Sequence, residues 1–396
     1  MGPLDGIKVI DISTIVSGPL AASMLGDQGA EVIKIEPPLK GENARDLGPI
    51  KGDTGALFAA VNRSKKSLAL DLKKESSKEI IYKLIEKTDV IIDNFRPGTL
   101  KRLGLDYENL KKHNTKIIQI SITGYGESGP YSKRRVYDPL IQATAGITDA
   151  QAYEGEPQFM KTLLCDKVTS LTAAQAITSA LYAREKNSVG QRITLSMIDA
   201  ALYFMWCDSM YNFTWLGDDW STIPNIADFY KPAKTKDGYV TIAAVNEGEF
   251  EGAIKAIDRE DLLMDERFST TENRFKYSVE MQRILSEEYL KFTSEDLVKR
   301  MDNNDVPVAR LNSREEMLTD PQVLNNKSII KISSNGKEVM QGPKAPAYFL
   351  GTKCEKPFFM PLLGEHSAEI LKELGFSEDE INDFIDENVI RGEKFD

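Results

Sequence analysis

The chain has 396 residues, of which 41% are hydrophobic, 28% charged and 8% aromatic, and its formal net charge at pH 7 is −11. A chain of this length and balance can bury its own core, so we expect a globular protein of about two domains. The acidic charge argues against a nucleic-acid partner, because phosphate backbones require a concentrated basic surface.

Few residues are available for metal or triad chemistry. The sequence holds three cysteines and two histidines: Cys165, Cys207, Cys354, His113 and His366. The cysteines have neither a metal-ligand spacing nor a disulfide framework, which fits a reducing cytoplasm. Two histidines argue against a Ser-His-Asp triad and a His-ligated zinc site. The first residues lack the charged head and long apolar region of a secretory signal. No apolar run approaches the roughly 20 residues of a membrane span, so we expect no membrane partner.

The first half alternates between strand and helix patterns. Short β-branched runs at 7–12 and 31–36 predict buried strands, and the residues between them predict a helix over 19–28 that Gly18-Pro19 introduces. Strands are also expected at 68–72, 89–93, 116–122 and 191–196, with helices over 75–88 and around 100–102, and with Tyr107 in a loop. Such crossovers imply a parallel sheet covered by helices. The turn DISTIVSGP lacks the GxGxxG pattern, so the topology is Rossmann-like without a dinucleotide site.

The composition changes after a helix expected over 197–210, where an aromatic, turn-rich stretch begins. The predicted division is a large domain over 1–200, a linker over 201–225, a smaller α+β domain over 226–320 and a C-terminal segment over 321–396 that completes the large domain. Predicted elements beyond residue 225 are a strand at 239–243, helices over 249–256, 278–291 and 294–302, a hairpin around Asn335-Gly336 and a helix over 368–374.

Asp166 lies where the apolar run Leu163-Leu164-Cys165 meets a helix rich in small residues. We expect its carboxylate to be the N-cap of that helix, accepting from unpaired backbone N–H groups. Those contacts would keep its pKa low and the group ionised. On the local pattern alone, a cap with no further role is the simpler interpretation.

Six segments follow one another over nearly the whole chain: GIKVIDIS with SGPLAASMLGDQGAEVIKIEPP, NRSKKSLALDL, DVIIDNFRPGTLKRLGLDY, ISITGYGESGPY, DKVTSLTAAQAI with GQRITLSMIDA, and PLLGEHSAEIL. Together they resemble the class III CoA-transferases, a family that includes formyl-CoA and carnitine CoA-transferases and the related 2-methylacyl-CoA racemases. The resemblance implies an α/β fold with a Rossmann-like parallel-sheet large domain, a smaller α+β domain and an interlocked, ring-like homodimer.

The resemblance further implies that Asp166 is a nucleophile that attacks the thioester of an acyl-CoA. The expected intermediates are an aspartyl anhydride and then an aspartyl-CoA thioester, from which a carboxylic acid takes CoA. Acyl-CoA and a carboxylic acid are therefore the expected substrates, with coenzyme A as the carried group and no metal. Backbone N–H groups of residues 124–129 and Gly248 are candidate oxyanion donors.

A coenzyme A site is also implied by the resemblance. The 70–73 segment would lie under the adenine, and Arg135 and Tyr137 would lie near the thioester. Arginines suit this ligand because the guanidinium fork matches phosphate oxygens. The candidate contacts are Val16, Ser17, Leu70, Asp71, Leu72, Lys73, Asn94, Phe95, Arg96, Arg102, Arg135 and Tyr137; His366 is expected to be structural.

Two other interpretations remain open at this point. Racemases of the superfamily pair the aspartate with a histidine where this chain has Tyr137, whose pKa does not suit proton exchange, so a 2-methylacyl-CoA racemase or epimerase is the alternative. A CoA-binding protein without catalysis would need Asp166 only as a cap. The acidic segment Val245–Phe250 is expected to repel a small dianion such as oxalate.

Overall fold

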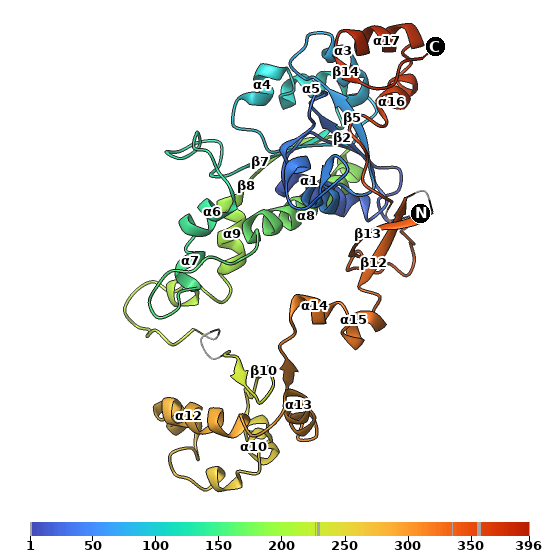
Figure 1. The fold of residues 1–396 in the computed structure, drawn as a ribbon. Helices are drawn as coiled ribbons and strands as arrows, with labels where there is room; N and C mark the ends of the chain where they lie inside the picture. Colours follow the sequence, from blue (N-terminus) through green and yellow to red (C-terminus); the bar gives the residue numbers. More distant parts are fainter. Residues whose placement is uncertain (1, 226, 228–229, 335, 355–357, 396) are drawn as a thin grey trace. The chain divides into compact units, whose positions relative to one another are not determined.

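The computed structural model describes residues 2–225, 227, 230–334, 336–354 and 358–395. The chain divides into two compact units, one formed by Met1–Cys207 with Lys327–Asp396 and the other by Asp208–Asn326 (Figure 1). The sequence predicts a separate linker over 201–225, whereas the structure assigns residues 208–225 to the second unit.

A seven-stranded sheet forms the centre of the first unit. Its order is β14-β5-β2-β1-β6-β7-β8, and every neighbouring pair is parallel except β14 with β5. Numbered along the chain, the six parallel strands run 3-2-1-4-5-6, which is the Rossmann order. The predicted parallel sheet is therefore confirmed. The strands are β1 (Lys8–Asp11), β2 (Glu31–Glu36), β5 (Lys65–Leu70), β6 (Val90–Asp93), β7 (Ile118–Thr123), β8 (Gln191–Ser196) and β14 (Ile390–Arg391).

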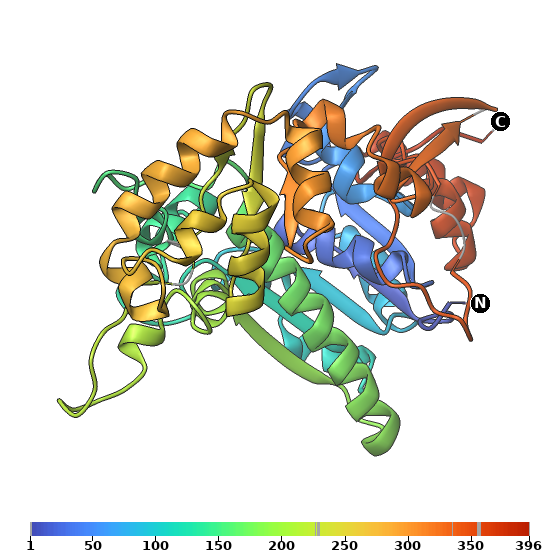
Figure 2. The same cartoon turned by 90° about the horizontal axis from the view of Figure 1, so that it is seen from below.

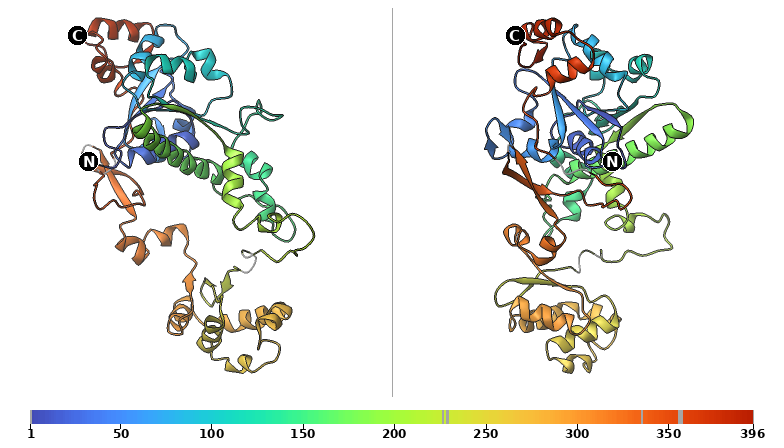
Figure 3. Two further views of the ribbon diagram at one scale, coloured as in Figure 1. Left: turned by 180° about the vertical axis from the view of Figure 1, so that it is seen from behind. Right: turned by 90° about the vertical axis from the view of Figure 1, so that its right-hand side faces the viewer.

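The two faces of β1, β2 and β5 differ in chemistry. Alternate residues such as Ile10, Ile33 and Leu68 belong to a hydrophobic core. The helices α3 (Ser77–Ile85), α5 (Tyr107–His113), α16 (Ser367–Glu373) and α17 (Glu378–Asp386) complete it, and Figure 3 shows the C-terminal helices beside the N-terminal part of the chain. The residues between them point to the opposite face, where Asp11 and Lys34 are buried. The expected strand at 68–72 is found at Lys65–Leu70: it begins earlier because Lys65 and Ser67 are also buried on this face, and it ends two residues earlier.

The helices of the first unit are α1 (Ser17–Gly26), α2 (Ala56–Asn62), α3 (Ser77–Ile85), α4 (Thr99–Leu103), α5 (Tyr107–His113), α6 (Asp138–Thr144), α7 (Ile147–Ala150), α8 (Leu164–Asn187), α9 (Met197–Met205), α16 (Ser367–Glu373) and α17 (Glu378–Asp386). The long α8 packs against α1 (Figure 2). The loop prediction at Tyr107 is wrong, since α5 begins there, and α9 ends five residues before the predicted Met210.

Shorter elements complete the first unit. They are the 3-10 helix η1 (Asn43–Asp46), the strands β3 (Ile50–Lys51) and β4 (Thr54–Gly55), and the hairpin of β12 (Ile329–Ser334) and β13 (Lys337–Pro343). The hairpin agrees with the prediction around Asn335-Gly336, although Asn335 itself lies outside the described residues.

The second unit contains a three-stranded antiparallel sheet in the order β11-β10-β9. Its strands are β9 (Ala233–Lys234), β10 (Tyr239–Ile242) and β11 (Val308–Arg310), and its helices include α10 (Glu247–Ala256), α11 (Thr271–Lys276), α12 (Ser278–Tyr289), α13 (Ser294–Asp302), α14 (Arg314–Met317) and α15 (Pro321–Asn325). The strand at 239–243 and the three helices predicted there are confirmed.

Among the residues that the structure describes, no helix combines the length and apolar character needed to cross a membrane. In the same residues, no group of three or more His, Cys, Asp or Glu side chains is arranged to hold a metal ion.

Candidate active site

The order of the strands along the sheet reverses between β1 and β6, and the loops that follow these two neighbouring strands lie side by side. The side chain of Asn94, directly after β6, joins them: its Oδ1 accepts from the backbone N–H of Thr14 at 2.9 Å and its Nδ2 donates to the Thr14 carbonyl at 2.7 Å. Open α/β sheets bind ligands at such a reversal, outside the carboxyl ends of the strands.

A cavity of about 540 Å³ opens beside these loops. Apolar side chains such as Leu72 and Leu103 line it together with the cations of Lys74 and Lys78. Apolar surface beside convergent cations suits a ligand that carries both a ring and phosphates. Half of the predicted coenzyme A contacts lie in its lining: Leu70, Asp71, Leu72, Lys73, Phe95 and Arg102.

The three residues after β6, Asn94 to Arg96, contact different parts of the structure. Asn94 joins the two loops, Phe95 borders the cavity just described, and Phe95 and Arg96 both border a second cavity of about 330 Å³. Asp93 lies in the lining of this second cavity, where burial raises its pKa to about 6. Arg96 is therefore separated from the cavity that holds Arg102.

Asp166 is the third residue of α8, which begins at Leu164 after an N-cap at Leu163. The prediction that Asp166 is the N-cap is therefore wrong. A carboxylate from another helix takes that role: Oδ2 of Asp138, the first residue of α6, accepts from the backbone N–H of Asp166 at 2.9 Å. The other oxygen of Asp138 accepts from Nε2 of Gln142 at 2.6 Å, and Asp138 is almost fully buried.

The predicted low pKa of Asp166 is also wrong. Its pKa is raised to about 6, chiefly by burial and then by the negative charge of Asp138, while donation by the hydroxyl and backbone N–H of Ser17 opposes the rise. The prediction failed because the carboxylate of Asp138, and not that of Asp166, accepts from a backbone N–H in the first turn of α8. Cys165 directly precedes Asp166, and burial is the main cause that raises the pKa of its thiol to about 12.

Ser17 connects the nucleophile candidate to the loops of the sheet. It is the first residue of α1, follows Val16, and is buried. Its carbonyl accepts from Oγ of Ser170 on α8 at 2.8 Å, and its Oγ lies 3.4 Å from Nδ2 of Asn94 as an acceptor. The structure thus brings Val16, Ser17 and Asn94 together with Asp166.

Two candidates lie on the approach to α6. Arg135 is exposed, and Tyr137, also exposed, is the residue that precedes α6. Tyr137 directly precedes Asp138 in the chain. The sequence analysis did not identify Asp138 as a candidate. The signal was an acidic residue directly before Pro139 at a helix start, a usual place for a group that binds backbone N–H donors.

Several remaining predictions concern residues outside these cavities. Nδ1 of His366 accepts from the backbone N–H of Ser67 at 3.2 Å, which agrees with its structural role. Glu247 pairs with Arg274, and Glu249 closes a capping box at the start of α10, which also contains Gly248. Both acidic side chains therefore have partners within the second unit, and the predicted repulsion of oxalate stays a prediction.

Comparisons with known proteins agree with one another. A sequence model described as CoA-transferase family III matches residues 4–367. The chain is 33% identical over 386 residues to the succinate–glutarate CoA-transferase of Agrobacterium fabrum, covering 94% of this chain and 96% of that protein. It is 32% identical over 382 residues to the acetyl-CoA:oxalate CoA-transferase of Acetobacter aceti, covering 95% and 97%. A crystal structure of a CaiB/BaiF family protein from Brucella suis superposes with a TM-score of 0.84 at 33% identity, over 94% of this chain and 99% of that one.

Proposed function

The chain belongs to CoA-transferase family III, and on this premise we propose that it moves CoA from an acyl-CoA to a carboxylic acid through covalent intermediates on Asp166. The observation that carries the proposal is the environment of Asp166. Its carboxylate is buried on a rigid helix, is held beside the donors of Ser17, and has a pKa of about 6. A carboxylate with that pKa is mostly ionised at neutral pH, yet more basic than an ordinary aspartate.

The first half of the reaction forms an anhydride. The Asp166 oxygen attacks the thioester carbon, the carbon–sulfur bond breaks, and CoA leaves as a thiolate. The thiolate then attacks the aspartyl carbonyl, which releases the donor acid as a carboxylate and leaves CoA on Asp166 as a thioester.

The second half runs in the opposite direction with the acceptor acid. Its carboxylate attacks the aspartyl thioester, and the released thiolate takes the acyl group from the new anhydride. The acceptor is already an anion, so no base is needed, which suits a site without histidine. Attack at the aspartyl carbonyl creates an oxyanion on Asp166, and the N–H and hydroxyl of Ser17 are the nearest donors to stabilise it.

Coenzyme A as a co-substrate fits the residues of the 540 Å³ cavity. Leu72 and Phe95 offer apolar surface to the adenine, and Lys73 and Arg102 offer cations to the phosphates. The remaining expected contacts, Val16, Ser17, Asn94, Arg96, Arg135 and Tyr137, would follow the ligand towards Asp166.

We propose that the protein acts as a cytoplasmic, interlocked homodimer. Large apolar side chains of the first unit are exposed in the single chain, among them Tyr203 at 87% and Leu350 at 86%. Exposed apolar surface on this scale is typical of an interface. The absence of a disulfide framework from the sequence supports a reducing compartment.

The first assay follows CoA transfer from a panel of acyl-CoAs to acids. The names of the relatives direct it to succinyl-CoA and acetyl-CoA as donors and to glutarate, succinate and oxalate as acceptors. Transfer that is lost in Asp166→Asn supports the proposal. Exchange of the α-hydrogen for solvent deuterium in an acyl-CoA, without transfer to any acid, would instead favour the racemase.

A further inference from the structure

The loop between β1 and α1 contains a residue in an unfavourable conformation. Ile15 has φ of 69°, in the left-handed region. A β-branched side chain is rarely found there, because its Cβ crowds the backbone, and such a conformation persists only where the surroundings hold it. The loop must therefore be held by contacts stronger than its own preference.

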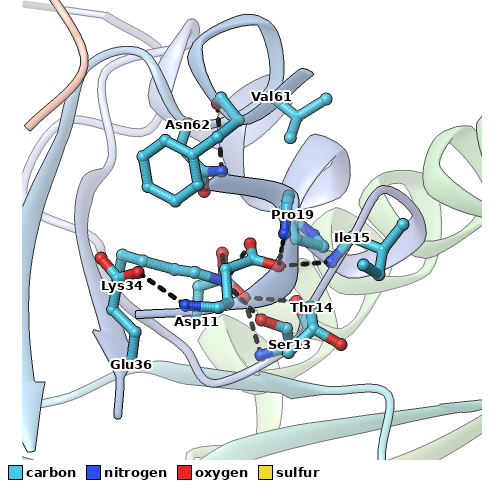
Figure 4. A network of polar contacts seen from close by, with 12 residues as sticks. Asp11, Ser13, Thr14, Ile15, Pro19, Lys34, Glu36, Val61 and Asn62 are labelled. Carbon is cyan, nitrogen blue, oxygen red and sulfur yellow. Dashed lines mark hydrogen bonds and ion pairs between the residues drawn. The ribbon is translucent and has the colours of Figure 1, made fainter. Parts of the chain in front are cut away.

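Those contacts come from buried charged side chains, which Figure 4 shows around Ser13, Thr14 and Ile15. Oε2 of Glu42 accepts from the backbone N–H of Ile15 at 2.7 Å. Nζ of Lys34 donates to the carbonyl of Ser13, and Oδ1 of Asp11 accepts from the backbone N–H of Ser13 at 3.0 Å. Three side chains from separate segments thus hold the backbone at Ser13 and at the strained residue itself.

Glu42 is itself held in place by charge. Its Oε1 lies 3.2 Å from Nζ of Lys34, whose side chain is fully buried, and its own side chain is buried beside it. Burial alone would lower the pKa of Lys34, but the carboxylates of Asp11, Glu42 and Glu36 outweigh that effect and raise it. Buried charges are costly to desolvate, and fixing a unique local geometry is one use that justifies them.

The strained residue lies two positions before Ser17, whose hydroxyl and N–H face Asp166. A rotation at Ile15 would move both donors, because Val16 is the only residue between them. From α1 Ser17 faces Asp166, from α6 the Asp138 carboxylate faces it, and Cys165 is the titratable neighbour on α8.

We propose that Glu42 is a positioning residue for Asp166: by holding the N–H of Ile15 it keeps the loop in its left-handed conformation and so presents Ser17 to the carboxylate. The inference rests on the proposed function, because it assigns Asp166 as the nucleophile. Both oxygens of Glu42 take part, because Oε2 accepts from the N–H of Ile15 while Oε1 pairs with the Lys34 ammonium that orients the side chain.

The test separates reach from charge at residue 42. Glu42→Gln keeps the length and one acceptor oxygen but loses the charge, whereas Glu42→Asp keeps the charge but withdraws the acceptor from Ile15. For each variant we would measure kcat, KM for the acyl-CoA and the pH profile of kcat/KM. Ser17→Ala is the reference for loss of the Ser17 hydroxyl as a donor. KM is measured separately because Glu42 also borders the 540 Å³ cavity.

We expect Glu42→Asp to lower kcat by roughly 10- to 100-fold, the size of effect that a small misplacement produces. The acid limb of its pH profile should move to higher pH by more than in Ser17→Ala, because Glu42→Asp displaces both the hydroxyl and the N–H of Ser17, whereas Ser17→Ala removes the hydroxyl alone. Glu42→Gln keeps an acceptor within reach of Ile15 but loses the pairing with Lys34, so its loss of kcat should be smaller than that of Glu42→Asp. The double variant Ser17→Ala/Glu42→Asp should shift the limb no further than Glu42→Asp alone, because both donors are already displaced there.

Arg45→Lys is the matched control for stability. Arg45 is buried in the same cluster, where it pairs with Glu36, but it does not touch the β1–α1 loop. Its melting temperature should fall while the acid limb stays in place.

An unchanged pH profile in Glu42→Asp, a loss of kcat in Glu42→Gln as large as in Glu42→Asp, or additive shifts in the double variant would overturn the inference. If Glu42→Asp does not fold, Glu42→Met, which keeps the length but has no acceptor oxygen for Ile15, takes its place and should show the same shift. Failure of the proposed function is a distinct result, because Asp166→Asn would then keep its transfer activity whatever the variants at residue 42 show.

Discussion

At the scale of single residues, the charge on Asp166 opposes folding. The pKa of Asp166 in the folded chain is about 6, against 3.8 for an ordinary aspartate, so the folded state binds the proton more tightly than the unfolded state. The resulting contribution to stability is fully present below about pH 3.8 and is lost as the pH rises through 6. Catalytic groups are often kept in such unfavourable environments.

Asp166→Asn should therefore stabilise the protein at pH 7.5. We expect a gain of about 1–3 kcal/mol in the free energy of unfolding, because the shift spans about two pKa units and each is worth about 1.4 kcal/mol. The gain should shrink at pH 5, where Asp166 is already protonated. Urea titrations at both pH values measure it, with exposed Asp149→Asn as the control within about 0.5 kcal/mol. A destabilised Asp166→Asn at pH 7.5 would contradict the argument.

Asp138 should set the acid limb of the reaction. Its negative charge is the second cause of the raised pKa of Asp166, after burial. Asp138→Asn removes that charge, so the acid limb of kcat/KM should move below pH 6, while kcat falls because one oxygen cannot serve both Asp166 and Gln142. A pH–rate profile measures both effects. Movement of the limb to higher pH would show that Asp138 acts on Asp166 in some other way.

The identity of the nucleophile candidate could be predicted from the sequence, but its environment could not. The family resemblance singled out Asp166 without reference to its neighbours. The role of Asp138 depends on α6 and α8 meeting 28 residues apart in the chain, and the contacts of Glu42 with Ile15 span 27 residues. Distances of this kind are set by packing, so local patterns do not report them.

At the scale of elements, apolar periodicity predicted the parallel strands well. It failed where a buried position carries a charge, as at Lys65 in β5, because a lysine in sequence indicates an exposed residue. It also failed at the short α5, where Leu110 is the only fully buried residue.

The edge strand β14 should support the cavity through β5. Ile390 is buried and pairs with Leu70, and the carbonyl of Val389 accepts from the N–H of Asp71 at 2.9 Å. Ile390→Ala should lower the free energy of unfolding by about 2–4 kcal/mol, as for other buried isoleucines. It should also raise KM for acyl-CoA, because the 70–73 segment loses its backing.

Denaturant titration and steady-state kinetics test both parts of this prediction. Leu39→Ala is the control, since its side chain is 78% exposed. A destabilised Ile390→Ala with unchanged KM would show that β14 supports the fold but not the cavity.

At the scale of the whole molecule, the single chain should not be the working unit. We expect sedimentation velocity to give the mass of a dimer, about twice 44.3 kDa, over the micromolar range. Tyr203→Lys places a charge in the exposed apolar surface and should weaken the dimer. A monomer at all concentrations would refute the proposed assembly.

The fold class followed from sequence at this scale, because strand–helix alternation and the family segments agreed. The central claim, a covalent bond to Asp166, is tested most directly by mass spectrometry of the intact protein and its peptides after incubation with acyl-CoA donors and trapping with hydroxylamine or borohydride. We predict a modification confined to the peptide that contains Asp166, absent from Asp166→Ala. Transfer activity with no adduct on that peptide, or an adduct that persists in Asp166→Ala, would contradict it.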